Sequence, residues 1–262
     1  MGLLRDNLPR HTYGVVGTYL GDDLVAAVVA VSIEENDDLV LQFPKTHTFS
    51  TGDSVTVQLD NRMSVPRITE ELPIHRVSYK GIVTATEPGF IEVRPLQFAI
   101  VYSDRLVAEY KDPGYVYPAA PRPEVALEES AQRPGLAWRS DDAQTNLGVL
   151  FTRAPERPHS TVMAFLSAGA GDVFLVTRPQ SFKARNIVRH PRVLFAVDYR
   201  ASYDLSKPLD WSYRLLSMKV HKISPGPLHT EVTQAFLTKN PWNSGFFAAP
   251  GSLLLHLVPE RV

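Results

Sequence analysis

Two residues with complementary chemistry, Ser181 and Lys183, lie in a short polar stretch between two apolar runs. The runs are Val173–Val176 and Val193–Val197, so the pattern predicts a strand, a polar turn, a short helix over Ser181–His190 and another strand. A serine at the N-cap and a lysine in the first helical turn lie beside unpaired backbone N–H groups and partial positive charge. This arrangement favours a bound phosphate. Serine is also a common N-cap and most lysines are solvated, so these two residues alone leave a purely structural role open.

The segments around this turn are spaced like the strands of a small antiparallel barrel. A second helix is expected over Leu228–Lys239, after a Pro-Gly-Pro turn. The expected strands of this half are Leu147–Thr152, His159–Leu166, Val173–Thr177, Val193–Val197, Arg214–Ile223 and Ser252–Val258.

Three motifs in this half carry a resemblance to a known family. They are residues 159–165 (His-Ser-Thr-Val-Met-Ala-Phe), residues 171–177 (Gly-Asp-Val-Phe-Leu-Val-Thr) and residues 181–193, which begin Ser-Phe-Lys. In this order they resemble the FMN-binding split β-barrel of the pyridoxamine-5'-phosphate-oxidase-like superfamily. The resemblance covers residues 146 to 262 and implies an FMN cofactor at the interface of a homodimer.

Carried over position by position, the resemblance implies that Ser181 and Lys183 bind the FMN phosphate. Ser160 and Thr161, on the facing strand, would add hydroxyl or backbone contacts. Val176 and Thr177 would run under the flavin ring, and Trp242 is a candidate to cover it. Asn186 and Arg178 are weaker candidates for binding.

Two departures from the family pattern argue against oxidation of vitamin B6. Thr161 and Phe182 stand where pyridoxamine phosphate oxidases carry arginines, and the C-terminal arginine and histidine that hold their substrate have no match in residues 246–260. Other members of the superfamily are flavin reductases, haem-handling proteins and enzymes that use the deazaflavin F420.

We therefore predict an FMN-binding split-barrel protein that acts as a flavin-dependent oxidoreductase on a small-molecule substrate or electron donor. F420 and haem are the alternative cofactors. Two alternative roles remain. One is a non-enzymatic carrier or sensor of flavin or haem, and the other is a barrel that has lost its cofactor and serves as a scaffold. The lone histidines have no metal-ligand spacing, so no metal site is predicted.

The first half of the chain reads as short strands separated by Gly-, Asp- and Asn-containing turns. Val55, Val57 and Leu59 alternate with polar residues, which is the pattern of a sheet with one face toward water. Strands without a clear helix predict a small closed antiparallel barrel of unknown role, with a brief helix over residues 106–110 as a further expectation. The expected strands are Tyr13–Tyr19, Leu24–Ile33, Asp38–Phe43, Ser54–Leu59, Arg76–Thr84 and Phe90–Arg94.

A proline-rich segment separates the two halves. Prolines at 118, 121 and 123 favour extended, semi-rigid chain that cannot lie inside a sheet. We predict a small β-barrel domain over residues 1–118, a linker over 119–136 that includes one or two helical turns at 125–132, and the split barrel over 137–262. An ordered strap lying across one larger domain is the alternative.

The composition excludes several classes of function. Lys and Arg total 27 against 28 Asp and Glu, so no global charge attracts nucleic acid or an acidic membrane. The chain has no cysteine, which rules out disulfides, thiolate metal sites and a cysteine nucleophile. The motifs of serine hydrolases, zinc proteases and P-loop enzymes are absent from the sequence. No signal peptide and no apolar run of membrane-spanning length is found, so a cytoplasmic location is expected.

Overall fold

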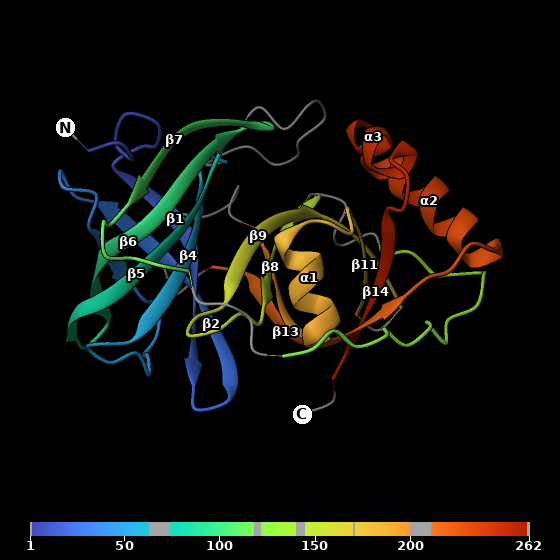
Figure 1. Cartoon of the computed structure of the whole chain (residues 1–262), viewed down its shortest axis with the longest axis horizontal. Helices are drawn as coiled ribbons and strands as arrows, with labels where there is room; N and C mark the ends of the chain where they lie inside the picture. The colour runs from blue at the N-terminus through green and yellow to red at the C-terminus, as the bar shows by residue number, and fades with distance from the viewer. Residues whose placement is uncertain are drawn as a thin grey trace.

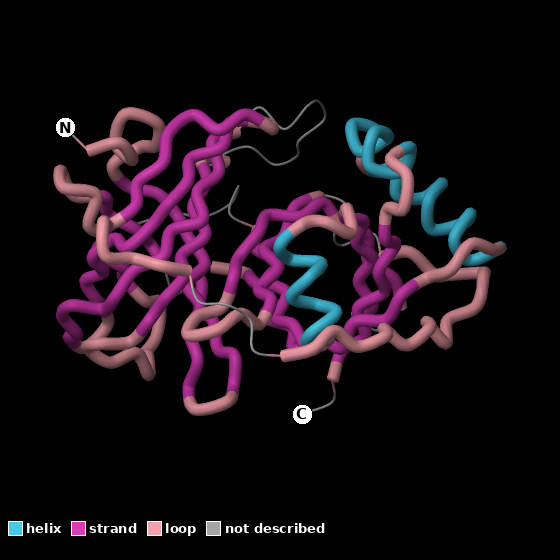
Figure 2. Tube along the Cα trace, in the orientation of Figure 1, coloured by secondary structure: helices cyan, strands magenta, loops and turns pink. Residues whose placement is uncertain are grey.

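The strands form two antiparallel sheets that follow one another along the chain (Figure 1 and Figure 2). The computed structural model describes residues 2–62, 74–117, 122–139, 145–169, 171–199 and 211–260. The first sheet contains β1 (His11–Leu20), β2 (Asp23–Ile33), β3 (Leu39–Gln42), β4 (Ser54–Asp60), β5 (His75–Glu87), β6 (Phe90–Tyr102) and β7 (Arg105–Lys111). The second contains β8 (Leu147–Thr152), β9 (His159–Ala164), β10 (Leu166–Ala168), β11 (Asp172–Thr177), β12 (Arg192–Asp198), β13 (Tyr213–Lys222) and β14 (Leu253–Pro259).

The first sheet closes into a barrel. Its strand order is β3-β2-β1-β4-β5-β6-β7, and β3 also pairs with β6, so β1 to β6 form a ring. Apolar side chains fill the interior, among them Val57, Tyr79 and Phe98, which have no exposed surface. Closure satisfies backbone groups that an open sheet would leave at its edges.

The second sheet curls so that its two edges come from one bent stretch of chain. Its order is β10-β11-β14-β13-β12-β8-β9, and the edge strands β9 and β10 are separated by Phe165 alone. The first part of this stretch pairs with β8 and the second part with β11. The predicted fold class, a mostly β chain with a small closed barrel followed by a split β-barrel, is confirmed.

The helices of the described residues all belong to the second half of the chain (Figure 2). They are α1 (Phe182–Arg189), α2 (Pro227–Lys239), the single 3₁₀ turn η4 (Pro241–Asn243) and α3 (Ser244–Ala248). Among them, none has the length and apolar character needed to cross a bilayer.

Both short helices expected between the two barrels are wrong. Residues 106–110 lie in β7, which pairs with β6. Residues 125–132 run extended along the second sheet, where the amide of Val125 donates to the carbonyl of Val188 and the amide of Ser130 donates to that of Lys222. The described part of the expected linker is therefore a strap whose backbone hydrogen bonds are made to the barrel rather than within a helix.

Strand β4 is buried on both faces because the second barrel covers its polar side. Val57 points into its own barrel, whereas Thr56 and Gln58 are 0% and 2% exposed on the opposite face. Thr56 Oγ1 donates to the carbonyl of Pro158, and Ser160 Oγ donates to Gln58 Oε1 at 3.1 Å. The alternation in the sequence is real, but its polar face meets another sheet instead of water.

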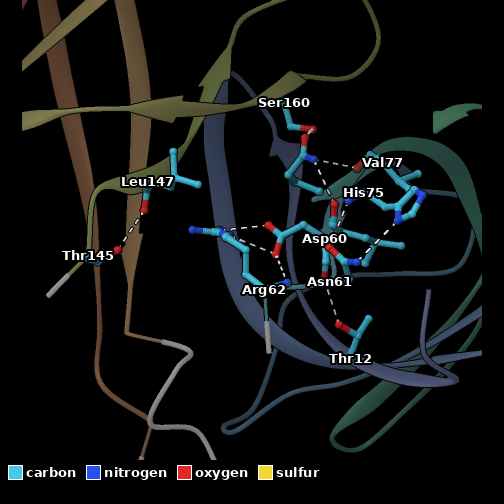
Figure 3. A network of polar contacts seen from close by, with 11 residues as sticks. Thr12, Asp60, Asn61, Arg62, His75, Val77, Thr145, Leu147 and Ser160 are labelled. Atoms are coloured by element: carbon cyan, nitrogen blue, oxygen red, sulfur yellow. Dashed lines mark hydrogen bonds and ion pairs between the residues drawn. The ribbon is translucent and has the colours of Figure 1, made fainter. Parts of the chain in front are cut away.

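A buried ion pair ends this strand (Figure 3). The Arg62 guanidinium donates from Nε to Asp60 Oδ1 at 3.0 Å and from Nη2 to Asp60 Oδ2 at 2.9 Å. The side chains are 5% and 0% exposed. Removing either partner of a buried bidentate pair is strongly destabilising, because the remaining charge is then buried without compensation.

We expect Asp60→Asn to lower the free energy of unfolding by about 3–5 kcal/mol, because it leaves the Arg62 charge buried without a carboxylate. Urea titration monitored by circular dichroism measures the change. The exposed Asp23→Asn is the matched control and should change stability by less than about 0.5 kcal/mol. A loss below about 1 kcal/mol for Asp60→Asn would show that water compensates Arg62 at this position.

Candidate functional site

A cavity of about 320 Å³ is lined by residues of both sheets. The second barrel supplies most of the wall, from β8, β9, β11, α1 and the turn after α2. The first barrel contributes Arg76 at the start of β5, together with Ser103 and Asp104 after β6. This volume falls within the range of about 300–1,000 Å³ that is usual for small-molecule sites.

The start of helix α1 determines where Lys183 lies. Ser181 is the N-cap, and its Oγ accepts a hydrogen bond from the amide of Ala184 at 3.3 Å. Lys183 follows in the first turn and lines the cavity, where its amine has no hydrogen bond or ion pair with any described residue. Burial, with the nearby charges of Arg76 and Arg178, lowers the pKa of Lys183 to about 8.

Two further residues of the cavity wall carry donors without acceptors in the described part of the chain. Nε of Arg76 and Nδ2 of Asn243 are buried and make no hydrogen bond there. The other end of the Arg76 guanidinium donates from Nη2 to the carbonyl of Ser103. Burial lowers the pKa of Arg76, and the charge of Asp60 offsets part of that effect. Buried donors are nearly always paired in proteins, so unpaired donors around one hollow favour a ligand rich in oxygen acceptors.

Apolar and aromatic side chains complete the wall. Trp242 and Phe246 come from η4 and α3, and Val162 and Val176 come from β9 and β11. The guanidinium carbon of Arg178 lies 5.4 Å from the centre of the Phe246 ring. A flat aromatic ligand packs well against a surface of this kind. Polar atoms at the edge of such a ligand would need hydrogen-bond donors from the cavity wall.

The structure brings four of the predicted site residues together at this cavity: Thr161, Val176, Lys183 and Trp242. Thr177 and Ser181 lie at the start of the helix with their hydroxyl oxygens 3.0 Å apart, so they support the Lys183 turn rather than face the cavity. Arg178 is exposed and close enough to Lys183 to lower the pKa of that amine.

Ser160 and Asn186 lie elsewhere. The Ser160 hydroxyl points to the first barrel, where it bonds Gln58 (Figure 3). Asn186 Nδ2 donates to Thr152 Oγ1 at 3.1 Å, and the residue borders a different hollow of about 210 Å³ beside Tyr19.

Sequence reasoning missed the contribution of the first barrel. Arg76, Ser103 and Asp104 come from a half of the chain in which no spacing suggested a site. Their role depends on contacts with residues more than 40 positions away, which no local pattern encodes. Asn243 could have been proposed from the sequence, since it directly follows the predicted site residue Trp242.

His159 is held neutral. Burial is the largest cause that lowers its pKa to about 3, and the positive charges of Lys80 and Lys183 contribute to the same shift. Its Nε2 lies 3.1 Å from Thr161 Oγ1 and its ring packs edge-on against Phe182. A histidine with this pKa does not exchange a proton near neutral pH, so it serves as a packed, hydrogen-bonded neighbour of the cavity.

No model of a known protein family matches the sequence, and neither does any curated protein. Some solved structures are similar to part of the chain. The haem storage protein HutZ of Vibrio cholerae is 16% identical with a TM-score of 0.39, over 47% of this chain and 87% of HutZ. A putative pyridoxamine 5'-phosphate oxidase of Listeria innocua is 17% identical with a TM-score of 0.36, over 45% of this chain and 86% of that protein. An FAD-binding protein of Mesorhizobium loti is 14% identical with a TM-score of 0.35, over 48% and 94%. The fold assignment accordingly stands on the strand order of this chain.

We expect Lys183→Met to raise the melting temperature of the ligand-free protein by about 2–4 °C, equivalent to about 1 kcal/mol, because it removes a half-buried charge that has no partner among the described residues. In the folded chain the pKa is about 8, below the value of about 10.4 for an unfolded lysine. The gain should therefore be full below pH 8 and shrink as pH rises toward 10.4.

Differential scanning calorimetry at pH 7 and pH 10 measures this gain. The exposed Lys45→Met is the matched control and should leave the melting temperature unchanged at both values. A Lys183→Met variant that is less stable than the parent at pH 7 would show that the amine is satisfied in the folded protein.

Proposed function

We propose that this chain binds FMN in the cavity between its two barrels and acts as a flavin-dependent oxidoreductase. The observation that carries the proposal is a hollow with an aromatic wall whose lining residues Lys183, Arg76 and Asn243 each have a donor without an acceptor among the described residues. A ligand that satisfies them must carry both anionic or carbonyl oxygens and an extended apolar surface. A flavin mononucleotide has both.

Lys183 and the first turn of α1 would hold the phosphate. An ammonium and free backbone amides at a helix start are the groups that a dianion needs. Arg76 and Asn243 would donate to oxygens of the ligand, and Trp242 with Val176 would pack against its ring. Bound FMN supplies hydride and electron transfer, and the chain orients the ring and excludes water.

The cavity wall contains no described pair of groups placed for acid and base catalysis. His159 is neutral and hydrogen-bonded, and Asp104 is the one carboxylate among the described lining residues. Hydride transfer to a flavin demands no such pair, so this wall suits redox chemistry with a small-molecule substrate or electron donor better than hydrolysis.

Haem and F420 are the alternative cofactors. Haem iron in proteins is usually held by histidine, cysteinate, tyrosinate or methionine, and Met163 is the one described lining side chain of these types. Met163 is 7% exposed, and a lone thioether makes a weak anchor. F420 would present a ring and phosphate oxygens to the same donors as FMN, so only a binding experiment separates the two.

We expect Lys183→Met to weaken FMN binding by about 10- to 150-fold, the effect of losing a hydrogen bond to a charged group worth about 1.5–3 kcal/mol. Quenching of flavin fluorescence in a titration at pH 7 measures the dissociation constant. Lys45→Met should bind like the parent.

The affinity of the parent protein should be highest between about pH 6 and pH 8. Below about pH 6 the phosphate takes up its second proton, and above pH 8 the Lys183 amine, whose pKa is about 8, loses its charge. Lys183→Arg keeps the charge, so its affinity should stay level from pH 8 to pH 9.5. Equal affinity of the parent and Lys183→Met would refute the phosphate assignment. A Soret band with added haemin, or retention of F420 but not FMN, would instead identify the alternative cofactor.

A further inference from the structure

The two barrels of this chain have the same strand connectivity. In the first, the ring of paired strands runs β1-β2-β3-β6-β5-β4 and back to β1. In the second, it runs β8, then the bent stretch β9 and β10, then β11, β14, β13 and β12, and back to β8. If each barrel is numbered from its own first strand, both rings read 1-2-3-6-5-4.

The pairing register is the same as well. Val15 pairs with Val28, and Val149 pairs with Val162, so both members of the pair recur 134 positions later. The same difference relates Ser32–Val40 in the first barrel to Leu166–Phe174 in the second. A shift of one residue would turn every side chain to the other face, so agreement over three consecutive strands is not a trivial property of barrels.

Glycines mark the same point in both barrels. Tyr13-Gly-Val-Val-Gly-Thr18 corresponds to Leu147-Gly-Val-Leu-Phe-Thr152. A Cβ on Gly14 would lie 3.2 Å from the carbonyl oxygen of Gln58, and one on Gly148 would lie 2.8 Å from that of Ala196. Gln58 and Ala196 occupy matching positions, since they pair with Val15 and Val149. The chain is therefore an internal repeat of one barrel.

The two barrels lie side by side (Figure 1), and the contacts between them are reciprocal, as in a symmetric dimer. Strand β9 of the second barrel contacts β4 and β5 of the first, and the equivalent strand β2 of the first contacts β12 and β13 of the second. Matched positions meet each other at the centre, where the Arg153 guanidinium lies 5.6 Å from the ring centre of Tyr19. Reciprocal contacts of this kind are the signature of a two-fold interface.

This pseudo-symmetry creates two equivalent positions between the barrels, and they differ in content. One is the cavity with Lys183, bordered by Leu147 and Arg76. At the other, the matching positions hold Tyr13 and Tyr213. Tyr13 packs edge-on against Trp211 with ring centres 4.9 Å apart, and Tyr213 joins the same apolar cluster. The first barrel also has no helix between β3 and β4, so nothing there corresponds to Lys183.

We infer that the chain is a fused pseudo-dimer that forms one cofactor site by itself, with the first barrel taking the part of a second subunit. The inference rests on the proposed function and gives the first barrel its role, which is to supply Arg76 to the ligand bound at Lys183. The equivalent position is closed by the aromatic side chains, so each chain holds one cofactor. The inference puts the site within one molecule, in place of the homodimeric site expected from the sequence.

A complementation experiment on the full chain tests where the site is assembled. Arg76→Met and Lys183→Met should each weaken FMN binding by about 10- to 150-fold, whereas the exposed Arg94→Met control should bind like the parent. The two defective variants are then co-expressed with different tags, purified together or separately, and titrated with FMN. A site within one chain predicts no high-affinity binding in the mixture and one FMN per parent chain.

Recovery of one high-affinity site per two chains in the mixture would overturn the inference, because it requires Arg76 and Lys183 from different molecules. An Arg76→Met variant with parental affinity would also overturn it, while leaving FMN binding itself intact. A parent protein that binds no FMN at all contradicts the proposed function, and the inference falls with it.

Discussion

The constraint on which the rest of the site depends is the burial of cationic side chains between two sheets with few carboxylates to balance them. Lys183 reaches the cavity from α1 and Arg76 reaches it from β5, and the charge of Arg76 adds to burial in lowering the pKa of Lys183. Such an arrangement is costly in the empty protein, since a charge that leaves water needs a partner. The capped helix start, the closed first barrel, the curled second sheet and the inter-barrel hydrogen bonds keep these groups in place despite that cost.

Much of the fold could be predicted because the deciding interactions are local. Period-2 alternation and turn residues located the strands of both barrels, including β8, for which the expected and observed bounds coincide. The Ser181 cap of α1 was predicted from residue type and spacing and is confirmed by its hydrogen bond to Ala184. The failures lie where a segment takes its structure from a neighbour. Strand β7 follows the edge of β6, and residues 125–132 follow the second barrel, so neither could be recognised from its own sequence.

The candidate site could be predicted only for its second-barrel part. Lys183, Thr161, Val176 and Trp242 lie near one another in a single barrel, and their motif spacing pointed to them. Arg76 joins them only because β4 and β5 pack on β9, and the polar face of β4 gave the opposite expectation of contact with water. The internal repeat escaped notice for a related reason. Few residues are identical at equivalent positions of the two barrels. The barrels agree in strand register and connectivity, which become visible only when the pairing of the strands is known.

The shared wall of the cavity has a mechanical consequence. Because cations from separate barrels would grip one ligand, that ligand acts as a clamp across the junction, and sliding or opening of one barrel against the other would pull its contacts apart. Occupancy and stiffness of the junction are then linked in both directions: whatever loosens the barrels promotes release, and release in turn frees them to move.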